Sequence, residues 1–283
     1  MKSRYILQFF ILIIFLFSGC QKKIEEPTVL AANLWIGYAP LYYAFEKDWL
    51  RQNGIKFVVT MSLGQTLEYY KKGSIDIFGG TNYEYKEAKR VKKDLQAIKL
   101  LDISKGGDLI YSNRSIDELR GSKNIDIYEE TNSVNSLLVK KFLQTYKIEE
   151  KNTNLINTSA GKFLKLKMKK NPVLLVVYKP NDKNLKKRGF RVLDTAKSLN
   201  LTIFDALLVS KKYAQKHQEK IAKIKKIFDK ALQILKNNPQ KFYEVINPRF
   251  NYKHYSDFTN DLKSISWKSN KSLNSLVTQE EIK

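Results

Sequence analysis

A strand, a sharp turn and a helix follow one another near the start of the chain, and this order restricts the fold more than any other feature. Residues 29–36 form a short apolar run, Gly37 permits a sharp turn, and Pro40 suits the first turn of a helix, where a backbone N–H has no partner to lose. Behind Pro40 the apolar side chains recur at helical spacing, at Leu41, Ala44, Phe45 and Trp49. The segment therefore predicts a strand that turns directly into a helix.

A second strand completes this unit. Asn53 and Gly54 are typical of a helix end in the left-handed conformation, and residues 55–61 are again largely apolar. A β-α-β unit of this kind places Trp35 and Tyr38 at the carboxyl end of the first strand, which is where open α/β sheets form their ligand crevices. We therefore expect both aromatic side chains near a binding site.

The remainder of the chain alternates between strand and helix patterns, which predicts an α/β fold with parallel strands and crossover connections. The clearest helix spans 212–237, where an apolar stripe faces a lysine-rich side, and we expect Pro248 to separate two later helices at 242–246 and 255–265. Shorter helical patterns lie at 67–72, 83–93, 134–143 and 163–168. Strand patterns recur at 75–78, 95–101, 108–111, 125–128, 154–157, 173–178, 191–193 and 203–209.

Three of the predicted helix N-termini follow polar segments at the ends of strands. These segments are Gly64-Gln65-Thr66, Gly80-Thr81-Asn82 and Asn132-Ser133. Unpaired backbone N–H groups at a helix start carry a partial positive charge, which favours an anion or a carbonyl-rich polar group. Helix starts are common, but three at the ends of successive strands indicate one crevice. The candidate ligand-binding residues are Trp35, Tyr38, Gly64, Gln65, Thr66, Gly80, Thr81, Asn82, Asn132, Ser133 and Tyr178, with ordinary core packing as the alternative for the aromatic side chains.

Three motifs, in this order, resemble a known family. Residues 35–47, 73–81 and 205–211 are similar to solute-binding proteins of the nitrate/sulfonate/taurine and pyrimidine-precursor group, the NMT1/THI5-like and SsuA/TauA-like proteins. The resemblance implies an α/β, two-lobed type II periplasmic binding protein fold with two chain crossings between the lobes. It implies three segments: the first part of lobe 1 at 29–110, lobe 2 at 111–202 and the second part of lobe 1 at 203–283.

Two positions depart from the family pattern. Tyr178-Lys179-Pro180 stands where the family usually has Trp-Glu-Pro, and Asn132-Ser133 stands where it has Gly-Ser before a helix. A lysine in place of a glutamate shifts the local charge towards anionic ligands, unless Lys179 is simply solvated. The expected ligand is a small organic anion such as a sulfonate, or a flat heterocycle such as a pyrimidine.

The first 20 residues resemble a bacterial lipoprotein signal peptide. Lys2 and Arg4 precede an apolar run at 9–17, and small residues lead to Cys20, the only cysteine of the chain. We expect cleavage before Cys20, lipidation of its thiol and a tether at 21–28, so that the protein is anchored to a membrane in the periplasm or at the cell surface. The alternative is an ordinary cleaved signal with an incidental cysteine.

The charge of the chain is strongly basic but does not indicate a nucleic-acid partner. Of the 51 basic residues, eight are Arg and 43 are Lys, and the formal net charge is +23. Phosphate clamps and base-reading sites favour the arginine fork, whereas these lysines are scattered over nearly every segment. A lysine-rich solvated surface is the preferred interpretation, with a general attraction for anions and anionic membranes.

No catalytic or metal-binding constellation is recognisable in the sequence. His217 and His254 are isolated, and a single lipidated cysteine leaves none for catalysis, so we expect neither an enzyme nor a bound metal or cofactor. Asp76 and Asp205 could form an acid pair, but capping and hinge hydrogen bonds are the preferred interpretation.

The expected function is that of a lipid-anchored, monomeric solute-binding protein that delivers a small molecule to the permease and ATPase subunits of an ABC importer. The importer is implied by the family resemblance, whereas the residues themselves indicate secretion, the fold class and a crevice. The alternative is a sensor or scavenger that uses the same fold without a transporter.

Overall fold

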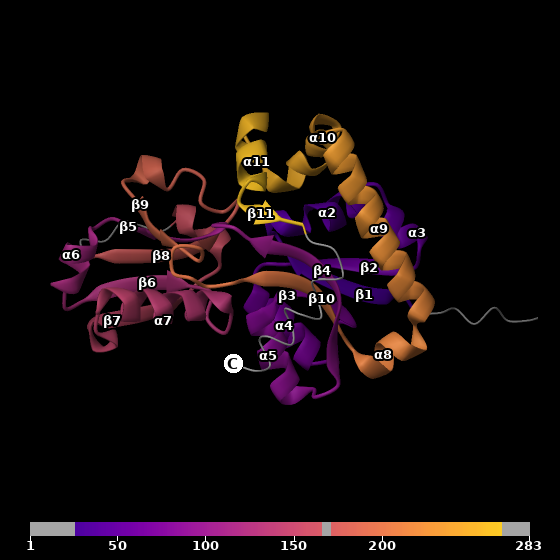
Figure 1. Cartoon of the computed structure of the whole chain (residues 1–283), viewed down its shortest axis with the longest axis horizontal. Helices are drawn as coiled ribbons and strands as arrows, with labels where there is room; N and C mark the ends of the chain where they lie inside the picture. Colours follow the sequence, from indigo (N-terminus) through magenta and orange to yellow (C-terminus); the bar gives the residue numbers. More distant parts are fainter. Residues whose placement is uncertain (1–25, 166–170, 268–283) are drawn as a thin grey trace, which may run out of the picture.

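The computed structural model describes residues 26–165 and 171–267, which form two lobes side by side along the long axis of the molecule (Figure 1). The first lobe contains a six-stranded sheet. Its strand order is β11 (Ile265–Ser266), β4 (Leu95–Ser104), β10 (Phe204–Ser210), β3 (Ile77–Thr81), β1 (Thr28–Asn33) and β2 (Ile55–Thr60).

The second lobe contains a five-stranded sheet. Its strand order is β7 (Thr153–Asn157), β6 (Ile125–Glu129), β8 (Val173–Tyr178), β5 (Asp108–Ser112) and β9 (Arg191–Thr195). The chain passes between the lobes twice, first between β4 and β5 and then between β9 and β10. The α/β, two-lobed architecture with two crossings is therefore confirmed.

Strand direction follows from these crossings. Strand β1 pairs in parallel with β2 and β3, and β6 pairs in parallel with β7 and β8, as crossover connections require. In contrast, β10 is antiparallel to β3 and β4, and β5 is antiparallel to β8 and β9. The expectation of parallel pairing holds only within each run of consecutive β-α units, because β5 and β10 enter their sheets from the opposite lobe.

Helices cover the sheets of both lobes. In the first lobe they are η1 (Ile36–Tyr38), α2 (Ala39–Glu46), α3 (Trp49–Gln52), α4 (Leu63–Lys71), α5 (Asn82–Val91), α8 (Lys211–Lys216), α9 (Gln218–Asn237), α10 (Pro239–Phe250) and α11 (Tyr255–Leu262). In the second lobe they are α6 (Ile116–Arg120), α7 (Val134–Tyr146), η2 (Glu150–Asn152), η3 (Ala160–Lys165) and η4 (Lys186–Arg188). None of the helices within the described residues is long and apolar enough to cross a membrane.

Several predicted helix boundaries are wrong for identifiable reasons. Helix α4 begins at Leu63, earlier than expected, because the Ser62 hydroxyl accepts from the backbone N–H of Gln65 and caps the helix. The predicted helix at 212–237 is two helices, α8 and α9, separated at His217. Pro248 does not break α10, since it lies in the last turn and only two helical residues follow it. The predicted helix at 163–168 extends beyond the described residues, and η3 covers its first part as a 3₁₀-helix.

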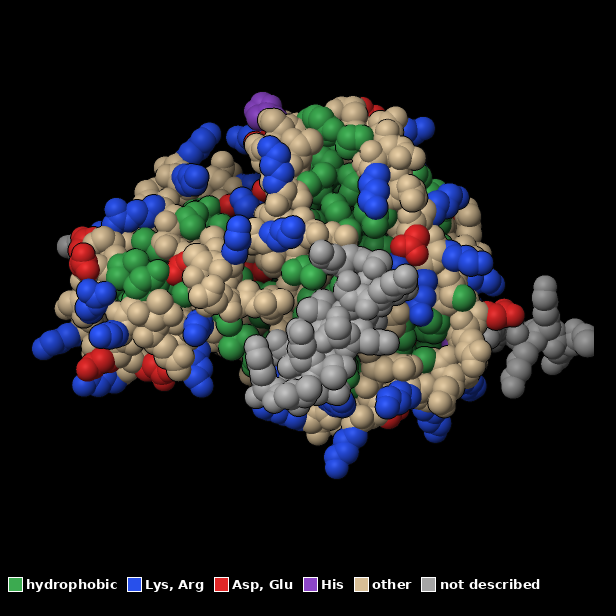
Figure 2. All heavy atoms as spheres, in the orientation of Figure 1, with side chains coloured by type: hydrophobic (Ala, Val, Ile, Leu, Met, Phe, Trp, Pro, Cys, Tyr) green, Lys and Arg blue, Asp and Glu red, His purple; other side chains and the backbone are tan. Residues whose placement is uncertain are grey.

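The core of the first lobe is rich in aromatic side chains between α2, α9 and α10. Tyr43 stacks on Phe242 with ring centroids 4.6 Å apart, and Tyr42 lies edge-on to Phe250 at 5.2 Å. Lysine and arginine side chains cover the surface of both lobes on the face shown in Figure 2, without gathering in one region. A scattered basic surface over apolar cores agrees with the interpretation of the lysines as solvating groups.

Candidate ligand-binding site between the lobes

The carboxyl ends of β1 and β8 meet where the two lobes touch. Asn33 Nδ2 donates to the Tyr178 hydroxyl at 2.9 Å, and this hydroxyl donates to Glu130 Oε1 at 3.0 Å. All three side chains are buried. A hydrogen-bonded chain therefore joins the first lobe to the second inside the boundary between them, which we call the interlobe cleft.

Trp35 lies on the first-lobe side of this cleft, and Tyr38 is packed within the first lobe. The indole N–H of Trp35 donates to the Asp102 carboxylate, 3.1 Å from Oδ2, and its ring lies edge-on to Tyr178 with centroids 6.1 Å apart. The Tyr38 hydroxyl donates to Asp205. Both rings are buried, so in this closed arrangement they also serve as packed core, the alternative that the sequence left open.

A cluster of buried aspartates lies behind these two rings. Asp102 and Asp205 are directly opposite each other on the neighbouring strands β4 and β10, and Asp108 begins β5 just after the first crossing. Burial raises the pKa of all three carboxyl groups, that of Asp108 to about 6, and the adjacent Asp102 raises the pKa of Asp205 further. Asp102 and Asp205 therefore keep their protons to higher pH than exposed aspartates do.

Glu84 connects the first lobe to a helix of the second. Its Oε2 accepts from the backbone N–H of Thr81 at 3.0 Å, in a capping box that starts α5. Its Oε1 accepts, also at 3.0 Å, from the backbone N–H of Val134, the first residue of α7. Burial raises the pKa of the Glu84 carboxyl. A carboxylate of one lobe thus occupies the N-terminus of a helix in the other.

Glu130 makes the reciprocal contact. It follows β6 in the second lobe, and its Oε2 accepts from the backbone N–H of Leu63, the first residue of α4 in the first lobe, at 3.3 Å. Its Oε1 accepts from the backbone N–H of Ala160 at 3.2 Å in addition to the Tyr178 hydroxyl. Burial raises the pKa of Glu130 to about 7, although these hydrogen bonds oppose the shift. Both helix N-termini are therefore capped across the cleft.

Several residues expected in the site lie at this boundary. A Cβ on Gly64 would lie 2.9 Å from the carbonyl oxygen of Thr131, so the missing side chain permits α4 to approach the second lobe closely. Asn132 adopts the left-handed conformation (φ 57°), and Ser133 then caps α7. Asn82 Nδ2 donates to the carbonyl oxygen of Thr202 in the second crossing, at 3.1 Å.

Other expected residues are engaged within the first lobe. Gln65 Oε1 accepts from the backbone N–H of Met61, and the Thr66 hydroxyl donates to the carbonyl oxygen of Ser62. These two residues and Gly64 form the first turn of α4, so the predicted polar loop is absent. Gly80 and Thr81 end β3, which passes directly into α5, so no loop separates them either. The close-packed strand-to-helix junctions explain both corrections.

Four residues of the cleft carry buried polar atoms without a hydrogen-bond partner. Three of these atoms are acceptors, Asn33 Oδ1, Asn82 Oδ1 and Asp108 Oδ2, and one is a donor, Asn135 Nδ2. A buried polar atom without a partner is costly, by roughly 1–3 kcal/mol, and calls for a ligand, a water or a functional role. The sequence did not single out Asn33, Asp108 or Asn135, or Glu84 and Glu130. Only Glu84 had a local signal, the Thr81-x-x-Glu84 capping box, which says nothing of α7.

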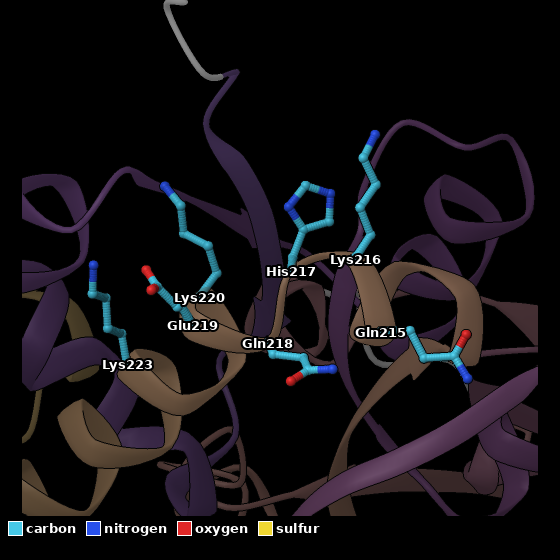
Figure 3. Close-up of a pocket in the computed structure, with 7 residues that line it drawn as sticks. All are labelled: Gln215, Lys216, His217, Gln218, Glu219, Lys220 and Lys223. Carbon is cyan, nitrogen blue, oxygen red and sulfur yellow. The ribbon is translucent and has the colours of Figure 1, made fainter.

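Cavities occur at the rim of the cleft and elsewhere. One of about 170 Å³ lies at the lobe boundary beside Ala160, and its two basic side chains, Lys183 and Arg249, both have partners. Another of about 370 Å³ opens on the surface where α8 meets α9 (Figure 3), and its lining is mostly exposed, including Lys216 and Lys223. Ligand sites usually bury most of the ligand surface, so the boundary fits a ligand site better than the exposed α8–α9 cavity.

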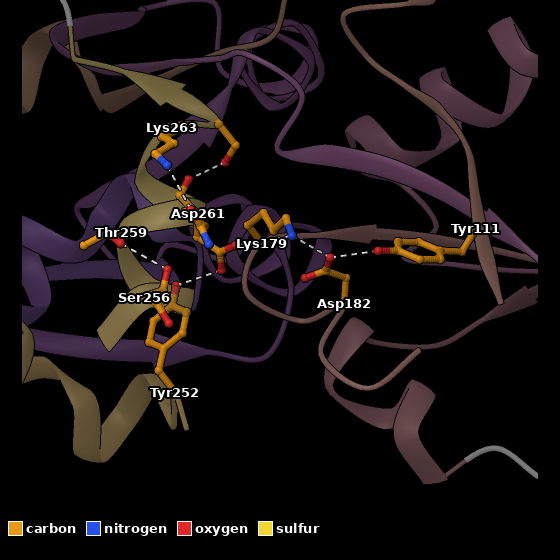
Figure 4. Close-up of polar contacts among 10 residues, drawn as sticks. Tyr111, Lys179, Asp182, Tyr252, Ser256, Thr259, Asp261 and Lys263 are labelled. Atoms are coloured by element: carbon orange, nitrogen blue, oxygen red, sulfur yellow. Dashed lines mark hydrogen bonds and ion pairs between the residues drawn. The ribbon is translucent and has the colours of Figure 1, made fainter. Parts of the chain in front are cut away.

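An ion-pair network also joins the lobes outside the cleft (Figure 4). Lys179 Nζ lies 2.6 Å from Asp182 Oδ2 in its own lobe and 3.2 Å from Asp261 Oδ1 on α11. The Tyr111 hydroxyl donates to Asp182 at 2.9 Å, and the Tyr252 hydroxyl donates to Asp261 at 3.0 Å. Lys179 is therefore paired with two carboxylates and is largely buried, so it is not the solvated lysine that was one of the two sequence-based interpretations.

The aspartates that the sequence raised as an acid pair make separate hydrogen bonds. Asp76 Oδ2 accepts from the backbone N–H of Val29 at 2.8 Å, and Asp205 accepts from Tyr38. The hydrogen-bonding interpretation is confirmed for both. Within the ranges 26–165 and 171–267, no group of three or more His, Cys, Asp or Glu side chains is arranged to hold a metal ion.

Two mixed sheets, two crossings and a buried polar boundary between the lobes define the class of the structure, which is the two-lobed periplasmic binding protein fold. SsuA from Escherichia coli, a periplasmic aliphatic sulphonate-binding protein, matches with a TM-score of 0.68 and 16% identity over 91% of each chain. The alkanesulfonate-binding SsuA from Xanthomonas axonopodis pv. citri, bound to MOPS, matches with a TM-score of 0.68 and 17% identity. The match covers 89% of this chain and 90% of that one.

A third neighbour is the ligand-binding component of an ABC-type import system from Staphylococcus aureus, with zinc bound. It matches at a TM-score of 0.66 and 13% identity over 92% of this chain and 93% of that one. No protein-family model and no curated protein sequence matches the chain, so the NMT1/THI5-like assignment has no family match behind it. At these identities the likeness shows the fold alone.

Proposed function

We propose that this chain is a solute-binding protein that captures a small molecule in the interlobe cleft and presents it to an ABC importer. The observation that carries the proposal is the set of buried, partnerless polar atoms of Asn33, Asn82, Asp108 and Asn135 where the lobes meet. They belong to both lobes, so a ligand in the cleft that gives partners to atoms of each lobe would hold the lobes together.

The fold supports the transport role. Solved structures of similar architecture include two sulfonate-binding proteins and the ligand-binding component of an ABC import system. On this proposal the protein works in the periplasm or at the cell surface, held by lipid on Cys20, and it binds without chemical turnover. The ligand is a small organic molecule, and the aromatic faces of Trp35 and Tyr178 pack against its body when the lobes open and close around it.

Retention of a solute tests the binding function without knowledge of the ligand. The full-length protein, exposed to a low-molecular-weight extract of its growth medium, should retain one solute molecule per chain in native mass spectrometry. The Trp35→Phe and Tyr38→Ala variants should retain less of it. A wild-type protein that retains no solute, or variants that bind the identified solute with unchanged affinity, would contradict the assignment of the cleft.

The importer is tested separately. The liganded protein should stimulate ATP hydrolysis by its permease–ATPase complex in proteoliposomes, and the ligand-free protein should stimulate it less. Solute binding without any such stimulation would favour a sensor or scavenger of the same fold.

A further inference from the structure

We propose that Glu84 and Glu130 decide the charge of the ligand, because they occupy the helix N-termini at which an anion would bind. The interlobe cleft then excludes anions and takes an uncharged or cationic ligand that donates hydrogen bonds. This inference rests on the proposed function, and it replaces the anion that the helix N-termini led us to expect from the sequence.

The first step is the geometry of the two helix starts. A helix N-terminus binds an anion through backbone N–H groups that have no partner within the helix. At α7 the N–H of Val134 already donates to Glu84, and at α4 the N–H of Leu63 already donates to Glu130. Both carboxylates come from the opposite lobe. A ligand anion would have to displace both carboxyl groups from these N–H donors and then remain beside them in a buried site.

The second step is the chemistry of the atoms left without partners. Asn33 Oδ1, Asn82 Oδ1 and Asp108 Oδ2 are all acceptors, each on a side chain at least nine-tenths buried. Asn33 belongs to the cleft because its amide nitrogen donates to Tyr178, and Asn82 because its amide nitrogen donates to the second crossing. These three acceptors require a ligand that brings N–H or O–H groups, which a sulfonate group lacks, and the one unpartnered donor, Asn135 Nδ2, requires a single acceptor.

The third step is the balance of charge. Five carboxyl groups lie buried at or next to the cleft: Glu84, Asp102, Asp108, Glu130 and Asp205. Among the residues that the structure describes, Lys99 is the one buried basic side chain, and it pairs with Asp229 on α9. The basic side chains at the rim are engaged as well, Lys179 by two aspartates and Arg249 by Glu46. A positively charged or N–H-rich ligand finds acceptors in these carboxyl groups, whereas an anion would add to the charge of those that are ionised.

The test compares two flat probes that differ in the charge of one substituent. Benzamidine carries a cationic amidinium with N–H donors, and benzenesulfonate carries an anionic acceptor on the same ring. Their dissociation constants are measured by calorimetry and by thermal shift on the full-length wild type and on the double variant Glu84→Ala, Glu130→Ala. The ratio of the two constants should favour benzamidine in the wild type. The double variant frees both helix N-termini and should bind benzenesulfonate about tenfold more tightly.

Two further proteins keep the result interpretable. The double variant Glu84→Gln, Glu130→Gln retains an acceptor for each backbone N–H while removing the charge, so it should fold if the alanine variant does not, with a smaller gain of sulfonate binding. Glu87→Ala, on the same helix as Glu84 but paired with Arg90 at the surface, should behave as the wild type.

A wild type that prefers benzenesulfonate, or double variants that gain no sulfonate binding, would overturn the inference. If the wild type binds neither probe, the test depends on whether the double variants gain affinity for benzenesulfonate. A wild type that binds a sulfonate in the cleft would remove the inference and leave the proposed function standing. If the wild type retains no solute from the extract while the double variants gain sulfonate binding, the proposed function would fall and the inference about ligand charge would stand.

Discussion

The Nζ atom of Lys179, in the second lobe, lies 3.2 Å from Oδ1 of Asp261, on helix α11 of the first lobe. The side chains are 22% and 10% exposed, so water screens the pair only in part. This contact lies apart from the glutamates that cap α4 and α7. The closed arrangement is thus held by two sets of interactions, one inside the interlobe cleft and one at its rim.

Removing the rim contact should open the molecule. In Lys179→Met, Asp182 and Asp261 lose their shared cation while remaining largely buried, and we expect a loss of about 1–3 kcal/mol in the free energy of unfolding. Small-angle X-ray scattering should show a larger radius of gyration for the ligand-free variant. Lys187→Met, at an exposed position of η4, serves as the control. An unchanged radius would show that the glutamate caps suffice to hold the lobes.

The raised pKa of Glu130 predicts a specific dependence of stability on pH. In the folded chain the pKa of Glu130 is about 7, whereas the pKa of an unperturbed glutamate is 4.5. Between these values the folded state binds more protons than the unfolded state, so the contribution of Glu130 is fully present below pH 4.5 and is lost as the pH rises through 7.

The measurement compares guanidinium unfolding at pH 5 and pH 8 in the wild type and in Glu130→Gln. From pH 5 to pH 8, the free energy of unfolding of the wild type should fall by on the order of 2 kcal/mol more than that of the variant. Because the difference is taken against the variant, the titration of all other groups cancels to first order. Equal losses in the two proteins would mean that Glu130 does not titrate in this range.

A single methyl group at Gly37 should disrupt the cleft. A Cβ there would lie 1.8 Å from Asp102 Oδ2 and 2.4 Å from the indole nitrogen of Trp35, which are buried hydrogen-bond partners with no room to move apart. We expect Gly37→Ala to lose about 3 kcal/mol of stability and to abolish solute retention. At Gly121 the nearest atom would be 3.7 Å from the added Cβ, so Gly121→Ala should retain both properties. Normal ligand binding by Gly37→Ala would argue against the cleft.

The lipid anchor is predicted from sequence alone and lies outside the described residues. The variant Cys20→Ala should stay unprocessed or be released, because it lacks the thiol that would be lipidated. Partitioning into Triton X-114 should separate it from the wild type. Equal partitioning of the two proteins would contradict lipidation at Cys20.

The sequence predicted the architecture because its signals were local. Alternating strand and helix patterns and the junction at Gly37 and Pro40 depend on neighbouring residues, and the resulting elements are present. The predicted start of helix α4 is wrong because Ser62, which caps the helix, resembles a loop residue in the sequence. The fold is therefore recoverable from periodicity, whereas boundaries depend on individual side-chain contacts.

The contents of the site could not be predicted in the same way. Glu84 and Val134 are 50 residues apart in the chain, and Leu63 and Glu130 are 67 apart. Nothing in the local sequence around either glutamate indicates that its side chain caps a helix N-terminus in the other lobe. The sequence therefore identified where a helix start faces the cleft, but it could not show that a carboxylate already occupies it.

The position of β10 governs how the chain can be assembled. This strand lies between β3 and β4, but it follows the whole second lobe in the chain. The sheet of the first lobe therefore stays in two separate parts until β10, which begins at Phe204, has been synthesised. Pairings so distant in sequence form slowly, because a long loop must close before they contribute. The second sheet, from β5 to β9, is continuous in the chain and can form first. The second lobe can therefore be complete while the first still lacks the strand that joins the two halves of its sheet.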